Sequence, residues 1–211
     1  MSLNTFVAHQ FRKPTGFWGK LAVRAMMKGN RGAIAWAIEA SEIKSEDTVL
    51  EIGFGHGISF EMIAALTTQK VYGLDFSEDM VRMAAERNTK LMSQDRLELR
   101  CGEVANSAFE SDFFDKIIAV NVIYFWKQPQ KELAEIKRIL KPGGRAVLYL
   151  TDKSAMEKLS FTSTHVFTTY TGEEFAKEVK AAGFAKVHID TKLLKRKSLR
   201  VCHCIIAEKE P

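Results

Sequence analysis

One short stretch combines a carboxylate with glycines in a spacing suited to holding a nucleoside ligand. Residues 49–57 read VLEIGFGHG, with one acid and a glycine at every second position: Glu51, Gly53, Gly55 and Gly57. Glycine lets a backbone turn tightly and approach a ligand closely. The dinucleotide-binding fingerprint needs a glycine at its sixth position, which here is Ile58. The loop therefore favours a nucleoside cofactor other than a dinucleotide.

Short apolar runs alternate with helical patterns along the rest of the chain. The runs, rich in Val, Ile and Leu, are residues 48–52, 70–75, 97–101, 116–121 and 145–150. Between them lie helical patterns such as the one that Pro129 opens, with Leu133, Ile136 and Ile139 on one face. This alternation predicts a parallel sheet with helices on both faces, and ligands in such a sheet sit beyond the carboxyl ends of the strands.

The alternation ends after residue 183. Residues 185–194 and 198–209 are two adjacent strand-like runs, expected to pair antiparallel at the sheet edge. We therefore expect an α/β fold with a Rossmann-like, seven-stranded, mostly parallel sheet and an antiparallel C-terminal edge strand. Residues 46–211 form one domain in this interpretation, and residues 1–45 form an N-terminal helical extension.

Four stretches, in this order, resemble motifs of the class I S-adenosylmethionine-dependent methyltransferases. They are VLEIGFGHG, VYGLDFSEDMV, CGEVANSAFESDFFDKIIAVNVIYFW and RILKPGG. Within that family they resemble the small-molecule group related to the ubiquinone and menaquinone C-methyltransferases. The resemblance implies S-adenosylmethionine as methyl donor, S-adenosylhomocysteine as product and in-line displacement onto a small-molecule acceptor.

The resemblance also implies a cofactor site of ten residues. They are Glu51, Gly53, Gly55, Gly57, Asp75, Phe76, Met80, Glu103, Val104 and Asn121. Glu51 would approach the cofactor's ammonium, and Asp75 would accept from the two ribose hydroxyls. Glu103 would accept from the adenine amino group. Solubility at strand ends remains the alternative for the two acids, and core packing remains the alternative for Phe76 and Met80.

A general base is needed only if the acceptor must lose a proton. The candidate catalytic residues are Tyr124, His165 and His56, and the candidates beside the acceptor are Trp18, Tyr124 and Trp126. The Asn121–Tyr124 segment is similar to the Asn-Pro-Pro-Tyr motif of amino-methylating relatives but lacks both prolines. His188 and His203 alternate with apolar residues and are expected on the sheet surface. Cys202 and Cys204 are expected to pack in the sheet, and no metal site is predicted.

Charge is unevenly distributed along the chain. No acid precedes Glu39, whereas residues 17–31 carry a basic stripe of Lys20, Arg24, Lys28 and Arg31 on an otherwise apolar helical pattern. This pattern favours either a lid over the site or a helix lying on an anionic membrane, which would suit a lipid or quinone acceptor. An RNA or protein acceptor is a weaker alternative, because no nucleic-acid-binding module is recognisable.

The remaining expectations concern the compartment and rival functions. Three cysteines without a spaced framework, no apolar run of membrane-spanning length and no secretion signal indicate a cytoplasmic protein. A cofactor-binding regulator without turnover and an aminopropyl transferase are further alternatives. The oligomeric state and the atom that receives the methyl group stay open.

Overall fold

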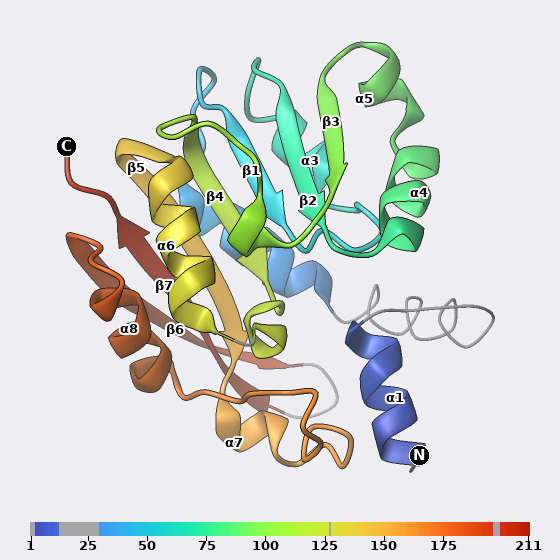
Figure 1. Ribbon diagram of the computed structural model, residues 1–211, viewed down its shortest axis with the longest axis vertical. Coiled ribbons are helices and arrows are strands. Elements are labelled where there is room, and N and C mark those ends of the chain that lie inside the picture. Colours follow the sequence, from blue (N-terminus) through green and yellow to red (C-terminus); the bar gives the residue numbers. More distant parts are fainter. Residues whose placement is uncertain (1–2, 13–29, 127, 196–198) are drawn as a thin grey trace.

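A seven-stranded sheet forms the centre of the molecule in the computed structural model (Figure 1). The structure describes residues 3–12, 30–126, 128–195 and 199–211. The strands are β1 (Val49–Ile52), β2 (Val71–Asp75), β3 (Leu97–Cys101), β4 (Phe114–Val120), β5 (Leu140–Thr151), β6 (Lys186–Lys195) and β7 (Leu199–Glu208). Their order across the sheet is β3-β2-β1-β4-β5-β7-β6. The predicted mostly parallel, seven-stranded sheet is confirmed.

The antiparallel strand lies one place inside the edge of the sheet. β1 to β5 pair in parallel, whereas β7 runs antiparallel to β5 on one side and to β6 on the other. β6 is therefore the edge strand and runs in the same direction as β1 to β5. The predicted antiparallel pairing of the two C-terminal strands is confirmed, with β7 joining them to the parallel part.

Helices cover both faces of the sheet. They are α1 (Leu3–Arg12), a helix over residues 30–41, α3 (Phe60–Ala64), α4 (Glu78–Arg87), α5 (Thr89–Ser93), α6 (Pro129–Ile139), α7 (Lys153–Met156) and α8 (Gly172–Ala181). Two 3-10 turns, η1 (Val104–Asn106) and η2 (Ile123–Phe125), follow β3 and β4. None of the helices in the described part of the chain has the length and apolar character to cross a membrane.

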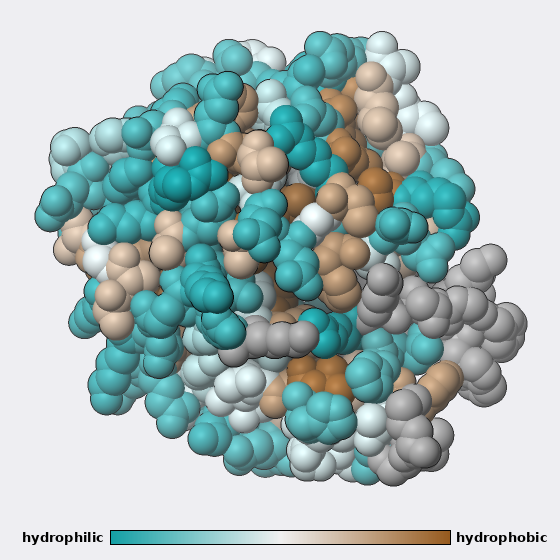
Figure 2. Space-filling view, in the orientation of Figure 1, coloured by the Kyte–Doolittle hydropathy of each residue, from teal (hydrophilic) through white to brown (hydrophobic). Residues whose placement is uncertain are grey.

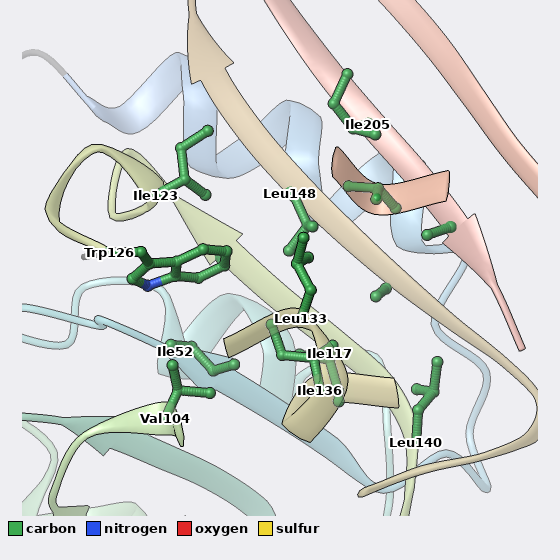
Figure 3. Close-up of a cluster of buried hydrophobic side chains, with 14 of the residues drawn as sticks. Ile52, Val104, Ile117, Ile123, Trp126, Leu133, Ile136, Leu140, Leu148 and Ile205 are labelled. Carbon is green, nitrogen blue, oxygen red and sulfur yellow. The ribbon is translucent and has the colours of Figure 1, made fainter. Parts of the chain in front are cut away.

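Two buried clusters fill the space between the sheet and these helices. Successive residues of a strand point to opposite faces, so Leu50 belongs to one cluster and Val49 to the other. On the first face, Leu133 and Ile136 of α6 pack among Ile117, Leu148 and Ile205 of the sheet (Figure 3). The predicted apolar stripe of α6 is confirmed, because its members are fully buried.

The outer surface of this face is largely hydrophilic. Figure 2 shows hydrophilic side chains over most of the view, with apolar ones visible between them over β2 and β3. Tyr72 of β2 forms edge-on ring contacts there with Phe109, Phe113 and Phe114. Such edge-to-face pairs add to the stabilisation that comes from area burial. Phe109 and Phe114 belong to the first cluster, and Tyr72 and Phe113 pack against it.

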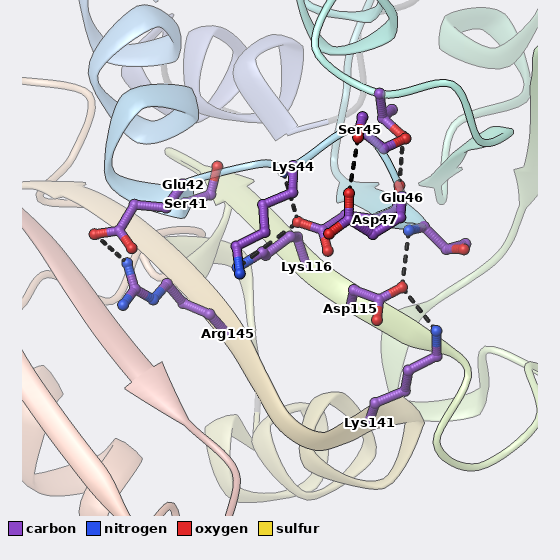
Figure 4. Close-up of polar contacts among 12 residues, drawn as sticks. Ser41, Glu42, Lys44, Ser45, Glu46, Asp47, Asp115, Lys116, Lys141 and Arg145 are labelled. Carbon is purple, nitrogen blue, oxygen red and sulfur yellow. Dashed lines mark hydrogen bonds and ion pairs between the residues drawn. The ribbon is translucent and has the colours of Figure 1, made fainter.

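Ion pairs gather at the amino ends of the strands (Figure 4). Arg145 contacts Glu42 at 2.7 Å and Glu208 at 2.9 Å. Asp115 accepts from the Thr48 backbone N–H at 2.8 Å and from the Lys141 ammonium at 2.7 Å. Charges at this end are thus compensated locally. At the opposite, carboxyl end of the strands, Glu51 and Asp75 form no ion pair with any described residue.

Candidate active site

A cavity of about 350 Å³ opens at the carboxyl ends of β1, β2 and β4. Its wall includes nine of the ten residues predicted to hold the cofactor: Glu51, Gly53, Gly55, Asp75, Phe76, Met80, Glu103, Val104 and Asn121. They lie at the carboxyl ends of β1 and β2, in the segments after β1 to β4 and in the first turn of α4, because parallel strands bring their carboxyl ends to one edge. The cavity therefore lies where the fold places ligands.

Two carboxylates lie buried side by side in the sheet at this wall. Glu51 is 3% exposed and Asp75 is 6% exposed. Burial raises the pKa of Glu51 to about 7, against the hydrogen bond that the Ser59 hydroxyl donates, and the nearby charge of Asp75 raises it further. Burial also raises the pKa of Asp75 to about 6. Within the described residues neither acid has a cationic partner, so a ligand with cationic or hydroxyl groups would satisfy them.

Asp75 also fixes the glycine loop. One of its carboxylate oxygens accepts from the Gly55 N–H at 2.9 Å, and the other accepts from the Ser77 N–H at 2.9 Å. Each oxygen keeps further lone pairs for a ligand. Ser77 is the N-cap residue of α4, but its side chain makes no capping hydrogen bond within the described residues. The acid that faces the cavity therefore supplies local order that the cap does not.

The three glycines of the loop have different surroundings. Gly55 has φ +56° and lines the cavity. A Cβ placed on it would meet no described atom within 4 Å, so no side chain covers this face of the loop. A Cβ at Gly53 would lie 2.1 Å from a methyl carbon of Val122. Gly57 is not among the residues of the cavity wall, and a Cβ placed on it would lie 2.9 Å from Ala84 and from Phe60. The structure therefore places Gly57 beside these two side chains, and its predicted contact with a cofactor stays a prediction.

Residues after β3 and from the first helix complete one end of the cavity. Glu103 and Val104 lie at η1, where Val104 is buried and Glu103 exposed. The guanidinium of Arg12, in α1, lies 5.7 Å from the centre of the Phe76 ring. Glu132 of α6 has one buried carboxylate oxygen that finds no hydrogen-bond partner in the described part of the chain, and burial raises the pKa of Glu132. Polar atoms thus remain free for a ligand at this end.

His56 lies in the cavity wall, and its buried Nε2 has no hydrogen-bond partner among the residues that the structure describes. Burial lowers the pKa of His56 to about 4, and the charge of Arg87 lowers it further. The ring is therefore neutral near pH 7. A general base works best when its pKa is close to the working pH, so this histidine is better suited to hydrogen bonding than to proton removal.

The other two candidate bases lie outside the cavity wall. Tyr124 is buried, its hydroxyl bonds to Asn121 and Thr151, and burial raises its pKa well above the ordinary value. His165 is exposed and contacts the ring of His9 in α1, 6.3 Å between centres. The structure therefore does not bring either residue to the site. Trp126 does line the cavity, and Trp18 lies outside the described residues.

His203 is a further correction. It is 8% exposed rather than on the sheet surface, because the start of α8 at Gly172 packs over its ring. Its Nε2 lies 3.1 Å from Asp152, and its Nδ1 lies 2.9 Å from the Thr191 hydroxyl. Cys202 and Cys204 are buried in the sheet as predicted. Across residues 3–12, 30–126, 128–195 and 199–211, no cluster of His, Cys, Asp and Glu is arranged to hold a metal ion.

Sequence reasoning missed three residues of the wall that come from the N-terminal part. They are Arg12, Asn30 and Ile34, which line the cavity although all precede β1. None of them stands in a recognisable motif. The basic stretch around them indicated a lid in general terms, but it gave no signal for these particular positions.

Comparison with known proteins identifies the family. A family model described as a methyltransferase domain matches residues 50–148. The uncharacterized methyltransferase YdaC of Bacillus subtilis is 30% identical over 178 residues, covering 84% of this chain and 92% of that protein. The chain belongs to the class I S-adenosylmethionine-dependent methyltransferases. S-adenosylmethionine is the methyl donor of this methyltransferase.

Two further relatives differ in the acceptor that their names state. The demethylmenaquinone methyltransferase of Clavibacter sepedonicus is 32% identical over 102 residues, covering 48% of this methyltransferase and 40% of that protein. The phosphoethanolamine N-methyltransferase 2 of Haemonchus contortus, solved with S-adenosylmethionine, has a TM-score of 0.71 and 18% identity over 86% of this chain and 53% of that one. The latter likeness is one of fold.

The raised pKa of Glu51 predicts how ligand binding by the methyltransferase depends on pH. A cationic ligand favours the ionised carboxylate, so below pH 7 binding must first remove a proton from Glu51. The affinity for S-adenosylmethionine should therefore fall by up to about tenfold per pH unit as the pH decreases from 7 toward 6. Titration calorimetry between pH 6 and pH 8.5 measures this dependence.

Glu51→Gln is the matched variant for this measurement, since it keeps the size and removes the titration. It should bind more weakly above pH 7 and lose most of the pH dependence. The folding stability of the ligand-free protein depends on pH in the opposite direction to ligand binding. Because the pKa of Glu51 is raised on folding, Glu51 contributes stability that is present below pH 4.5 and lost as the pH rises through about 7. A wild-type affinity that is constant from pH 6 to pH 8.5 would contradict the assignment.

Proposed function

We propose that the cavity holds S-adenosylmethionine and a small-molecule methyl acceptor side by side. In this proposal Glu51 faces the ammonium of the cofactor, Asp75 accepts from its ribose hydroxyls, and the bare face of Gly55 lies against it. The observation that supports this assignment most directly is the pair of buried carboxylates without a cationic partner among the described residues. Their chemistry fits a cofactor that carries one ammonium, one sulfonium and two vicinal hydroxyls.

The apolar part of the wall would serve the acceptor. Ile34 lines the cavity from the helix over residues 30–41, and Phe125 and Trp126 line it from the segment after β4. When bound, S-adenosylmethionine supplies a methyl group activated by its sulfonium. The protein then has to align the acceptor in line with that group and to keep water away. Side chains of this kind exclude water without competing as nucleophiles.

We further propose that the N-terminal extension acts as a lid in a cytoplasmic enzyme. Arg12 of α1 lies in the cavity wall, and Asn4 of the same helix contacts Ser160 at 3.3 Å, so α1 connects the cavity to the segment after α7. Cys101, Cys202 and Cys204 all lie in the described part of the chain and form no disulfide, which fits a reducing compartment. The segment 17–28, which the sequence also assigns to the lid, lies outside the described residues.

A lipid or quinone acceptor at a membrane surface is the second candidate. The names of relatives such as the demethylmenaquinone methyltransferase and the basic stripe of residues 17–31 favour it. If it is correct, changing Lys20, Arg24 and Lys28 to Gln should weaken binding to anionic vesicles by roughly 1 kcal/mol each. Vesicle sedimentation at low and high salt measures this. If the triple variant sediments with vesicles as the wild type does, or if the wild type does not sediment at all, the membrane-surface candidate is refuted. Methylation of a soluble small molecule is then the function that remains.

Turnover itself is tested by screening acceptors for S-adenosylhomocysteine formation. We expect at least one small molecule to raise the rate far above the slow background hydrolysis of the cofactor. Tight cofactor binding without any turnover, over a broad panel that includes lipids and quinones, would favour a cofactor-binding regulator. The same panel, extended with peptides and RNA, tests the alternative of a macromolecular acceptor.

A further inference from the structure

A chain of hydrogen bonds runs from the cavity wall into the interior at the end of β4. The Asn121 carboxamide nitrogen donates to the Asn30 side-chain oxygen at 3.3 Å. The Tyr124 hydroxyl donates to the Asn121 carboxamide oxygen at 3.0 Å. The same hydroxyl accepts from the Thr151 N–H at 2.5 Å. Asn30 and Asn121 line the cavity, whereas Tyr124 lies behind them and is 3% exposed.

The direction of these bonds follows from the protons available. A backbone N–H can only donate, so the Tyr124 hydroxyl accepts at Thr151 and keeps its single proton for another partner. That partner is the Asn121 oxygen at 3.0 Å in preference to the Thr151 carbonyl at 3.3 Å. Burial raises the pKa of Tyr124, so the hydroxyl stays protonated throughout the physiological range. The Asn121 carboxamide consequently turns its oxygen inward and its NH₂ group toward the cavity.

The backbone holds Asn121 in this place. Its φ is +57°, a left-handed conformation that asparagine tolerates better than most residues, and its N–H donates to the Tyr149 carbonyl at 3.1 Å. Strain of this kind persists where the surroundings over-determine a residue. One N–H of the carboxamide bonds to Asn30, and the second has no partner among the described residues. A hydrogen-bond donor is therefore available to a ligand here.

The carbonyl oxygens of the adjoining turn are already engaged. Those of Val122 and Ile123 accept from the N–H groups of Phe125 and Trp126 at 3.0 Å and 3.2 Å. The carbonyl of Tyr124 accepts from the Thr168 N–H at 2.9 Å. Each of these three carbonyls thus already accepts one hydrogen bond from within the protein. At this turn the side-chain group left free among the described residues is a donor, the second N–H of Asn121.

We infer that the acceptor is an acidic oxygen nucleophile, a phenolate or a carboxylate, that accepts a hydrogen bond from the Asn121 carboxamide and is methylated on that oxygen. This inference rests on the proposed function of the cavity. The sulfur–methyl bond breaks with its electron pair on sulfur, an oxygen lone pair forms the new bond, and the acidic proton has already gone to solvent. No side chain has to act as base. Tyr124 is a positioning residue, because it orients Asn121 and touches no reacting atom.

Matched pairs of acceptors test the inference directly. The probes are phenol and aniline, catechol and 1,2-diaminobenzene, and benzoate and benzylamine, each supplied with S-adenosylmethionine at pH 8 to the full-length protein. Mass spectrometry locates the new methyl group. We expect methylation of the oxygen member in at least one pair and a preference for it within that pair. Methylation of amines only, or no methylation of any oxygen probe, would overturn the inference.

Variants of the hydrogen-bond chain give a second readout. Tyr124→Phe removes the hydrogen bond that fixes the Asn121 carboxamide, so the amide can rotate and exchange the positions of its oxygen and nitrogen. The preference for oxygen acceptors over nitrogen acceptors should then fall about tenfold, the usual effect of one hydrogen bond. Asn121→Asp replaces a donor by an acceptor and should shift the preference toward the amine. Tyr72→Phe removes a hydroxyl outside the cavity wall and should leave the preference unchanged. An unchanged preference in Tyr124→Phe would contradict the positioning role.

Binding is followed separately from turnover. In the ¹⁵N-labelled protein loaded with S-adenosylhomocysteine, the signals missing from Asn121→Asp assign the Asn121 side-chain NH₂ group. Binding of the oxygen probe should change the chemical shift of one proton of this NH₂ group, and binding of the matched amine should not. Signals that do not respond to an oxygen probe at saturation would overturn the inference. Failure of the protein to bind S-adenosylhomocysteine at all would instead refute the proposed function, so the two failures are distinguishable.

Discussion

Asp75→Ala should weaken S-adenosylmethionine binding at least about 30-fold, equivalent to about 2 kcal/mol. The carboxylate is 6% exposed and carries two roles at once. It holds the glycine loop through the Gly55 N–H at 2.9 Å, and in the proposed function it would offer its remaining lone pairs to the ribose hydroxyls. Loss of the side chain removes both the ligand contact and the order of the loop. Titration calorimetry measures the change in affinity.

Asp79→Ala is the control for this variant. Asp79 lies four residues further on, in α4, and its carboxylate pairs with Arg82 at 2.7 Å on the surface. Its replacement should leave the cofactor affinity unchanged. Asp75→Asn should lie between wild type and Asp75→Ala, because an amide oxygen can still accept but the charge is gone. Equal affinities of wild type and a folded Asp75→Ala variant would show that this acid does not hold the cofactor.

Gly55→Val should abolish cofactor binding while the protein still unfolds cooperatively. At φ +56° a valine side chain costs backbone strain on the order of 1–3 kcal/mol, which a domain of this size tolerates. The added carbons would project into the open space of the cavity, where they would occupy the volume of the ligand. Thermal denaturation with and without S-adenosylmethionine reports both properties in one experiment, since only the wild type should be stabilised by ligand.

Gly57→Ala supplies the contrasting case. Its Cβ would meet Ala84 and Phe60 at 2.9 Å, away from the cavity, so the change should lower the unfolding temperature and leave the folded protein able to bind. Two glycines only two positions apart are thus expected to separate function from stability. The same loss of binding in both variants, or retained binding in Gly55→Val, would refute the assignment of the loop.

The parts of the fold that the sequence predicts are those set by local pattern. The run of residues 97–101 coincides with β3, and Pro129 opens α6 as expected, since apolar periodicity and a proline at the first helical turn act within a few residues. Nine of the ten residues predicted to hold the cofactor line the cavity for a related reason. They end a strand or follow one within a few residues, and parallel strands bring such residues together whatever the intervening chain does.

Residues whose surroundings come from distant segments could not be placed in this way. Whether His203 is exposed depends on α8 packing over it and on Asp152, 51 residues earlier in the chain. Tyr124 follows the cavity-lining Asn121 by three positions, yet the turn η2 directs its hydroxyl inward to Thr151. Gly57 shares the spacing of Gly55 but meets α4 instead of the cavity. Spacing alone does not distinguish these cases.

The position of β7 between β5 and β6 has a consequence for how the chain folds as it is synthesised. β6 emerges before the strand that joins it to the sheet, so it has no partner until β7 follows. The two strands are close in sequence, and their antiparallel pairing is a local event compared with the parallel pairing of β1 to β5. The parallel part and its glycine loop are complete by residue 151. The order of synthesis therefore favours assembly of the cofactor end first, with a preformed β6–β7 hairpin docking afterwards onto the open edge of β5.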